Sequence, residues 1–380
     1  MARSTSRPVV GLDIGSLGIR AVELSGEPGH WTMERAASAD LARGSVVNGA
    51  VRDPKAVADT LRTVWKQGRF TSSRVRFGIT NSVIMTRRAD LPWMAPSDFR
   101  RALPYLVADI LPVDLATVQL DYHPLEELEG VDEHGNVVET SRVLLVAADT
   151  QLVTDLAEVV RRARLEPTGA DNDAFALVRV VNGGVFTGTG GPDAVVDIGA
   201  NQLTVVVHSG GRPAFVRTVA NVGGDVVTLE ISDRLGLSVD DAEDLKRVTG
   251  LNGPAPVLAP LAESSVFGGL ATAESPMINP RVAAALDIIN PWASTVIGEL
   301  RNSLEYFRAS EGGTPVKSLT VVGQGALLEG LVDRMRTQLR LPITVLPPTL
   351  GLSLGKRLAA QPPSDNRFAV AAGLAMGIQP

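Results

Sequence analysis

The sequence predicts an α/β protein with two related lobes. Two β-rich runs, 9–15 and 194–201, each contain the turn Asp-Ile-Gly, and a second β-rich run follows each of them. The spacing between the two turns, from Asp13 to Asp197, is close to the length of one domain. At 380 residues, the chain is long enough for two or three domains. We therefore expect two similar domains that face each other.

Composition excludes several function classes. The chain has no cysteine, which excludes disulfides, thiolate nucleophiles and cysteine-based metal sites. With 36 basic and 42 acidic residues and no basic run, it is a poor candidate for nucleic-acid binding. The four histidines are far apart, and neither a P-loop nor a G-x-S-x-G elbow is present. No signal peptide or membrane-spanning run is recognisable, so we expect a soluble, cytoplasmic protein.

The first lobe begins with two strands, 9–15 and 19–24, because apolar residues alternate there and Gly15 and Gly18 mark a tight turn. A helix is expected over 54–67, after the cap-like Asp53.

A different pattern begins near residue 74 and predicts a compact α+β unit inserted in the first lobe, over about 74–149. Strands are expected at 74–84, 118–122 and 143–148, with the Gly/Glu-rich stretch 126–135 as a hairpin loop. A helix should open at Ser97, with a kink or a late start because of Pro104. Its apolar stripe, which we interpret as the core face of the unit, consists of Phe99, Leu103, Leu106 and Ile110.

The second half repeats the strand–turn–strand pattern at 194–201 and 203–207. Helices are expected at 150–163, 171–181, 225–235, 240–249, 328–339 and 368–376. A long helix should carry one apolar stripe that contains Trp292, Val296, Leu300, Leu304 and Phe307. The stretch 252–280, rich in Pro, Ala, Gly and Ser, is expected to be a mobile surface loop.

Glycine-rich turns beside acidic residues suggest phosphate binding. Backbone N–H groups in such a turn can hold an anion, and a neighbouring aspartate suits a hydrated Mg²⁺ that bridges carboxylate and phosphate. The turns at Asp13 and Asp197 could hold a phosphate tail from both sides, and Gly323-Gln324-Gly325 could make a third contact. One Asp-x-Gly turn alone is usually only a turn. Three turns in strand–turn settings, two of them matching, favour a site.

These motifs resemble those of a known superfamily. Residues 12–24 and 197–201 resemble the phosphate motifs of actin, DnaK-type chaperones and sugar kinases, and 323–326 resembles their adenosine motif, with Gln324 in place of the usual second glycine. Segments 241–247, 301–308 and 368–375 are similar to the PilM family of type IV pilus assembly proteins. The resemblance implies an actin-like ATPase fold: two duplicated ribonuclease H-like lobes around a nucleotide cleft, with a 1C subdomain of the FtsA/PilM type in the first lobe.

The resemblance also implies the subdomain boundaries. Subdomain 1A comprises 1–73 and 166–192, and the inserted 1C comprises 74–165. Subdomain 2A comprises 193–222 and 316–365, 2B comprises 223–315, and a C-terminal helix in 366–380 returns to 1A.

The residues that the resemblance assigns to ATP or ADP all lie in these motifs. Asp13 and Asp197 would lie near Mg²⁺, through water. Glu243 and Lys246 would reach the ribose and adenine, although such a pair is as often a solvated helix ion pair worth only about 0.3–0.5 kcal/mol. Arg20 stands where the family often has lysine. The remaining residues would contact the phosphates or the adenine: Gly15, Ser16, Gly18, Gly199, Ala200, Asn201, Gly223, Gly224, Gly323, Gln324 and Gly325.

The implied function is a cytoplasmic ATP-binding scaffold with at most slow hydrolysis, and no catalytic residue is assigned. The implied partners are the cytoplasmic N-terminal peptide of PilN, an inner-membrane protein, and other pilus assembly proteins. Membrane contact would occur only through partners, and a homo-oligomer is possible. The alternatives are an FtsA-like cell-division scaffold, a type II secretion L-type scaffold, and a sugar kinase. A sugar kinase would need a catalytic aspartate facing a polar pocket, and the apolar insert offers none.

Overall fold

The computed structural model describes residues 8–131, 137–187, 190–253, 279–310 and 314–377. Its two main sheets share one strand order, β10-β6-β1-β2-β3 in the first lobe and β15-β14-β11-β12-β13 in the second. In each lobe a three-stranded antiparallel meander continues into two strands that run parallel to its first strand. The repeated turns of the sequence therefore belong to duplicated lobes, which confirms the predicted fold.

The first lobe is built on β1 (Val10–Ile14), β2 (Gly18–Glu27), β3 (His30–Asp40), β6 (Arg74–Ile79) and β10 (Glu166–Asn172). Helices α1 (Pro54–Gly68) and α3 (Thr150–Arg162) cover one face of this sheet. The hairpin β4 (Val46–Val47) and β5 (Ala50–Val51), the edge strand β16 (Ser353–Leu354) and α9 (Lys356–Ala360) complete the lobe.

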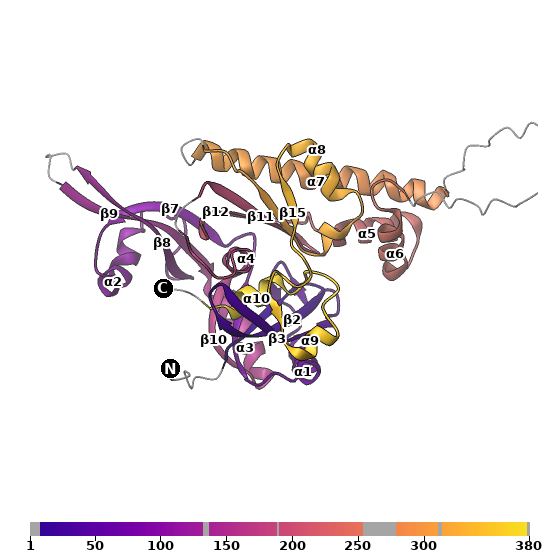
Figure 1. Ribbon diagram of the computed structural model, residues 1–380, viewed down its shortest axis with the longest axis horizontal. Helices are drawn as coiled ribbons and strands as arrows, with labels where there is room; N and C mark the ends of the chain where they lie inside the picture. The colour runs from indigo at the N-terminus through magenta and orange to yellow at the C-terminus, as the bar shows by residue number, and fades with distance from the viewer. Residues whose placement is uncertain (1–7, 132–136, 188–189, 254–278, 311–313, 378–380) are drawn as a thin grey trace, which may run out of the picture.

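Helices α4 (Asp173–Val181) and α10 (Ala369–Ala375) form a central layer between the two main sheets. Their side chains share one core with Val22 and Met33 of the first sheet and with Val195 and Val206 of the second. Figure 1 shows α4 and α10 between the lobes. Helix α10 also packs against β1 and β2 of the first lobe.

The second lobe contains β11 (Pro192–Ile198), β12 (Gln202–Ser209), β13 (Arg212–Ala220), β14 (Leu319–Val322) and β15 (Ile343–Val345). Its outer face packs against α7 (Pro280–Ser310), with α5 (Gly224–Leu235), α6 (Val239–Thr249) and α8 (Leu331–Leu339) around it (Figure 1). Trp292, Val296, Leu300 and Phe307 are buried along α7, as the stripe predicts, and Leu304 packs against the same core.

The insert extends to one side of the lobes (Figure 1). It contains β7 (Met85–Pro92), α2 (Pro96–Leu106), β8 (Val118–Val131) and β9 (Val137–Asp149), in the sheet order β7-β9-β8. Phe99 and Leu103 are buried in its core, and Leu106 and Ile110 pack against that core. Helix α2 begins at Pro96 and includes Pro104, so its start is not delayed.

The structure differs from the sequence-based expectations in several places. Strand β6 pairs with β1 and β10, and α3 packs against α1, so both belong to the first lobe and not to an insert over 74–165. Residues 126–131, expected in a loop, continue β8 because they pair with β9. Strands β3 and β10 were not predicted; β10 contains Pro167 and Gly169, two weak strand formers, and its register shifts between them. Most of the expected loop at 252–280 lies outside the described residues.

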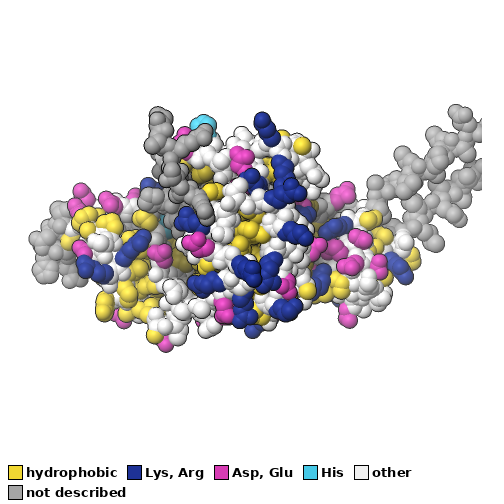
Figure 2. Space-filling model, turned by 90° about the horizontal axis from the view of Figure 1, so that it is seen from below, with side chains coloured by type: hydrophobic (Ala, Val, Ile, Leu, Met, Phe, Trp, Pro, Cys, Tyr) yellow, Lys and Arg dark blue, Asp and Glu magenta, His cyan; other side chains and the backbone are white. Residues whose placement is uncertain are grey.

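Basic side chains gather on the underside of the first lobe although the whole chain is acidic (Figure 2). Two helices of this lobe, α1 and α3, carry Lys66, Arg161 and Arg162 in their last turns. Cations at helix C-termini interact favourably with the helix dipole.

The central helix layer predicts a stability contrast between two helical glycines. A Cβ at Gly373 of α10 would lie 1.9 Å from the carbonyl oxygen of Ala176 in α4, whereas a Cβ at Gly298 of α7 meets nothing within 4 Å. Gly373→Ala should lower the free energy of unfolding by about 1–3 kcal/mol. Gly298→Ala should leave it unchanged or raise it by up to about 1 kcal/mol. Thermal unfolding of both variants checks this contrast, and equal melting temperatures would contradict it.

Candidate functional site

The first glycine turn lies at the end of β1, beside a buried aspartate. Gly15 N–H donates to the carbonyl oxygen of Gly18 at 3.0 Å, which closes the turn. Arg20 donates to the same oxygen at 3.1 Å, and its Nη1 lies 3.5 Å from Asp13 Oδ2. Burial raises the pKa of Asp13, and Arg20 partly offsets this. The guanidinium is thus held at the turn, next to the predicted phosphate position.

The second turn stacks on the start of α5. Gly199 N–H donates to the carbonyl oxygen of Gln202, and Gly224 N–H donates to that of Gly199, both at 3.0 Å. A Cβ at Gly223 would lie 2.2 Å from the carbonyl oxygen of Ala200, so this contact requires glycine. The structure therefore brings together the segments 199–201 and 223–224, which the family resemblance assigns to one phosphate site.

The third turn packs against the second. Gly323 has a φ of +87°, and a Cβ there would lie 2.2 Å from Asp197 Oδ1. A Cβ at Gly325 would lie 2.4 Å from Ile198 Cγ2. Gln324 begins a short 3₁₀ turn, 324–327. The Gly-Gln-Gly segment thus contacts the strand end that carries Asp197, as expected for motifs of one site.

Asp173, which sequence reasoning missed, joins Asp13 and Asp197. It is the first residue of α4 and is 7% exposed. Its carboxylate packs against Gly78, where a Cβ would lie 1.9 Å from Asp173 Oδ1. Burial, and then the charges of Asp13 and Asp197, raise its pKa well above the usual value. Its Oδ1 has no hydrogen-bond partner among the described residues. The run Asp171-Asn172-Asp173 was visible in the sequence, but without β10 it pointed to no site.

The donor set of these three carboxylates fits a hydrated cation. Burial, and then repulsion from Asp13, raise the pKa of Asp197 from its usual 3.8 to about 7. In the described part of the chain, no three acidic or histidine side chains are placed to hold a metal ion directly. Mg²⁺ keeps several of its waters in proteins, so a water-mediated site is the form that suits these carboxylates.

Glu243 and Lys246 of α6 form a buried network with α5. Lys246 is 8% exposed, and its Nζ donates to Glu243 Oε2 at 2.6 Å and to Thr228 Oγ1 at 2.8 Å. It also donates to the carbonyl oxygen of Gly224 at 3.0 Å. The pair is therefore not a solvated surface bridge: it fixes α6 against the first turn of α5, beside the second glycine turn.

Two polar contacts join the lobes beside these turns. Arg43, shortly after β3, forms an ion pair with Asp225 in the first turn of α5. Gln202 Nε2 donates to Thr80 Oγ1 at 2.8 Å, which connects β12 with the end of β6. The three glycine turns therefore lie beside contacts that a relative movement of the lobes would change.

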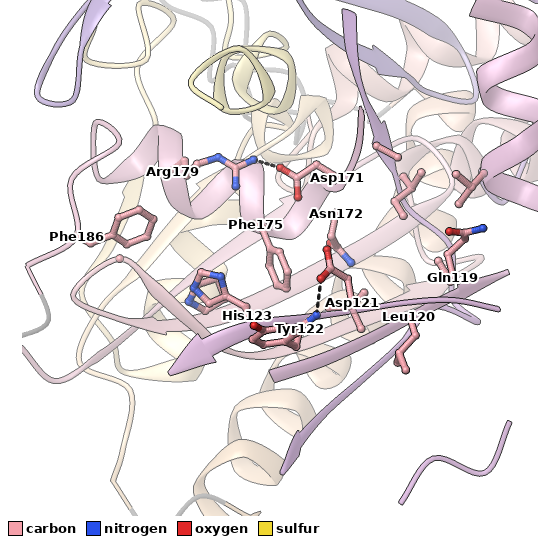
Figure 3. Close-up of a pocket in the computed structure, with 17 residues that line it drawn as sticks. Gln119, Leu120, Asp121, Tyr122, His123, Asp171, Asn172, Phe175, Arg179 and Phe186 are labelled. Carbon is pink, nitrogen blue, oxygen red and sulfur yellow. Dashed lines mark hydrogen bonds and ion pairs between the residues drawn. The ribbon is translucent and has the colours of Figure 1, made fainter. Parts of the chain in front are cut away.

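A separate cavity of about 360 Å³ opens where the insert meets the lobes (Figure 3). Its lining includes residues 119–123 of β8, Phe186, and four residues at and before α4: Asp171, Asn172, Phe175 and Arg179. A second cavity of about 390 Å³ shares His123 and Phe186 and continues along β8 to residue 127. We call the two cavities the groove. Its long wall, β8, is an outer strand of the insert sheet.

The first cavity of the groove is mainly apolar with a few fixed polar groups, whereas the second is lined largely by charged residues, among them Glu126, Arg142 and Arg212. Asp171 and Arg179 form an ion pair at its inner wall, and each side chain is 6% exposed (Figure 3). Burial, and then the charge of Arg179, lower the pKa of His123 to about 4, so its imidazole is neutral at neutral pH. Its Nε2 is buried and without a hydrogen-bond partner among the described residues. Apolar walls with a few placed polar groups are typical of binding sites.

Asp197 predicts an unusual pH dependence of stability in protein freed of metal and nucleotide. Its folded pKa lies above its unfolded pKa, so the wild type loses stability as pH rises from about 4 through about 7. Asp197→Asn removes this loss and should raise Tm at pH 8 by about 4–8 °C, the shift expected for about 2 kcal/mol. The gain should be smaller at pH 5. Asp287→Asn, at an exposed position of α7, is the control. A Tm difference that does not change with pH would contradict the prediction.

The described helices include none that is long and apolar enough to cross a membrane. The family model described as type IV pilus assembly protein PilM matches residues 11–267, and that of cell division protein FtsA matches 194–373.

Two solved structures are similar over almost the whole chain. One is a PilM–PilN type IV pilus biogenesis complex, with 25% identity, a TM-score of 0.75, and coverage of 98% of this chain and 99% of that chain. The other is the ethanolamine utilization protein EutJ from Carboxydothermus hydrogenoformans, with 12% identity, a TM-score of 0.54, and coverage of 98% and 90%. At this identity, EutJ shows the fold alone. The PilM match spans more than half of the sequence, so the chain belongs to the PilM family of type IV pilus assembly proteins and has an actin-like ATPase fold.

Proposed function

We propose that this chain is an ATP-binding scaffold of type IV pilus assembly that holds the N-terminal peptide of PilN in the groove. One observation carries the proposal: the insert and the lobes enclose a groove with a largely apolar first cavity, in a chain that aligns over 98% of its length with a PilM–PilN complex. An extended peptide can place an apolar side chain against Phe175 and Phe186 and its backbone along β8.

The nucleotide belongs to the cleft at the three glycine turns. Gly15, Ser16 and Gly18 on one side and the segment 199–201 on the other would hold the phosphates of ATP or ADP, with Arg20 beside them. Asp13, Asp173 and Asp197 would face Mg²⁺ through water, which relieves their mutual repulsion. The glycines at 323 and 325 would let the adenine approach the backbone, and the network of Lys246 and Glu243 would support the ribose side.

The arrangement suits a scaffold better than a fast enzyme. Contacts such as Arg43 with Asp225 join the two lobes, so a ligand held between the turns would fix one relative position of the lobes. We assign no catalytic residue, and slow ATP hydrolysis is compatible with this function. PilN would provide the connection to the cytoplasmic membrane, and other pilus assembly proteins would bind elsewhere on the surface.

Removal of the Asp13 carboxylate tests the nucleotide site. Asp13→Ala should weaken binding of ATP·Mg²⁺ by about 10- to 100-fold, the usual effect of removing a group that orients a bound metal. Because a buried charge is removed, the variant should remain folded. Isothermal titration calorimetry measures the affinity, and Asp287→Ala, at an exposed position of α7, is the control. Equal affinities of Asp13→Ala and wild type would overturn the site assignment.

A groove variant tests the peptide site. A synthetic peptide of the first residues of the cognate PilN should bind the wild type, and Phe186→Ala should lose about 10-fold or more in affinity, as for a buried aromatic contact. Tyr105→Ala is the matched control, because Tyr105 is 85% exposed on α2 of the same insert and lies outside the groove. Fluorescence anisotropy of the labelled peptide gives both affinities. An equal loss in both variants, or no binding to wild type, would refute the groove.

A further inference from the structure

Helix α4 lies between the groove and the cleft and contributes to both. Phe175 and Arg179, four positions apart, lie on the same side of the helix and line the groove (Figure 3). Asp173 precedes Phe175 by two positions, which is about 200° around the helix. It therefore faces away from the groove, toward Asp13 and Asp197 in the cleft. One helix thus presents opposite sides to two candidate ligands.

The residues just before α4 also lie between the groove and the proposed nucleotide site. Asp171 and Asn172 line the groove, and the next residue is Asp173 of the cleft. The Asn172 side chain caps the helix by accepting from Ala174 N–H at 2.8 Å. A displacement of Asp171 or Asn172 by a ligand in the groove would therefore be transmitted through one or two peptide units to the Asp173 carboxylate.

The far end of α4 is fastened, so this movement would be concentrated at the start of the helix. Arg179, near that end, donates through Nε to the carbonyl oxygen of Gly373 in α10 at 2.9 Å. Gly78 leaves only enough room for the Asp173 carboxylate, because a Cβ on residue 78 would lie 1.9 Å from Asp173 Oδ1. That oxygen is buried and without a hydrogen-bond partner among the described residues, which leaves it available to a ligand of the cleft.

We propose that a peptide in the groove changes the affinity of the cleft for ATP·Mg²⁺, and that the start of α4, from Asp171 to Asp173, carries this coupling. The inference rests on the proposed function, because it needs both ligands to bind. Coupling of this kind is reciprocal: the nucleotide must change the affinity for the peptide by the same factor. When two sites in a protein are coupled, one ligand usually changes the affinity for the other by about 5- to 150-fold. We therefore expect a change in affinity of at least 5-fold.

The test uses the full chain, ATP·Mg²⁺ and the synthetic PilN peptide. The affinity for ATP·Mg²⁺ is measured by calorimetry with and without saturating peptide, and the affinity for the peptide with and without saturating ATP·Mg²⁺. Wild type should give the same factor, at least 5-fold, in both directions.

The variant Asp173→Asn keeps the shape of the side chain and should bring the factor close to 1. Because Asp173 does not line the groove, the affinity of this variant for the peptide alone should stay within about 2-fold of wild type. Asp287→Asn should keep the full factor.

The outcomes separate this inference from the proposed function. If both ligands bind wild type and the factor is 1, the coupling is refuted and the proposed function stands. If the factor in Asp173→Asn equals that of wild type, the route through the start of α4 is refuted. Failure of either ligand to bind wild type overturns the proposed function, and the coupling with it.

Discussion

Three buried aspartates at the junction of the lobes are the constraint on which much of this structure depends. Asp13, Asp173 and Asp197 repel one another, and burial deprives each of water, so their ionised forms are costly. Arg20 is the cation that contacts Asp13 in the described structure. Under the proposed function, a bound cation would supply the missing positive charge and relieve this repulsion.

The glycines around this cluster follow from the same constraint. Gly78 and Gly323 lie where any side chain would collide with the carboxylates of Asp173 and Asp197. Their role is close approach, and only Gly323 also needs a positive φ. Gly11 serves the central layer in the same way, because a Cβ there would lie 1.9 Å from the carbonyl oxygen of Ala371. Backbone can thus pack against backbone where β1 meets α10, which places the end of the chain beside the first turn.

The sequence predicted the parts of this structure that local pattern determines. The repeated Asp-Ile-Gly turns revealed the duplication, and the stripe from Trp292 to Phe307 revealed the buried side of α7. Strand β10 remained hidden because Pro167 and Gly169 disfavour a strand, and its pairing with β6 depends on residues some ninety positions earlier. Asp173 was missed with it. The groove could not be predicted by residue, since β8, the start of α4 and Phe186 meet only in the folded chain.

The position of α4 explains how one helix can contribute residues to the groove and to the proposed nucleotide site while most of its length stays buried. Its remaining sides carry Ala174, Ala176, Leu177 and Val178, which are buried in the core shared by both sheets. That packing holds the helix axis in place, because a closely packed core resists gradual deformation. Movement is then easiest at the first turn, where Asn172 caps the helix and one oxygen of Asp173 has no hydrogen-bond partner within the described part of the chain. Substitutions in the middle of α4 should disturb stability and both sites together, whereas those at its start can separate the two sites.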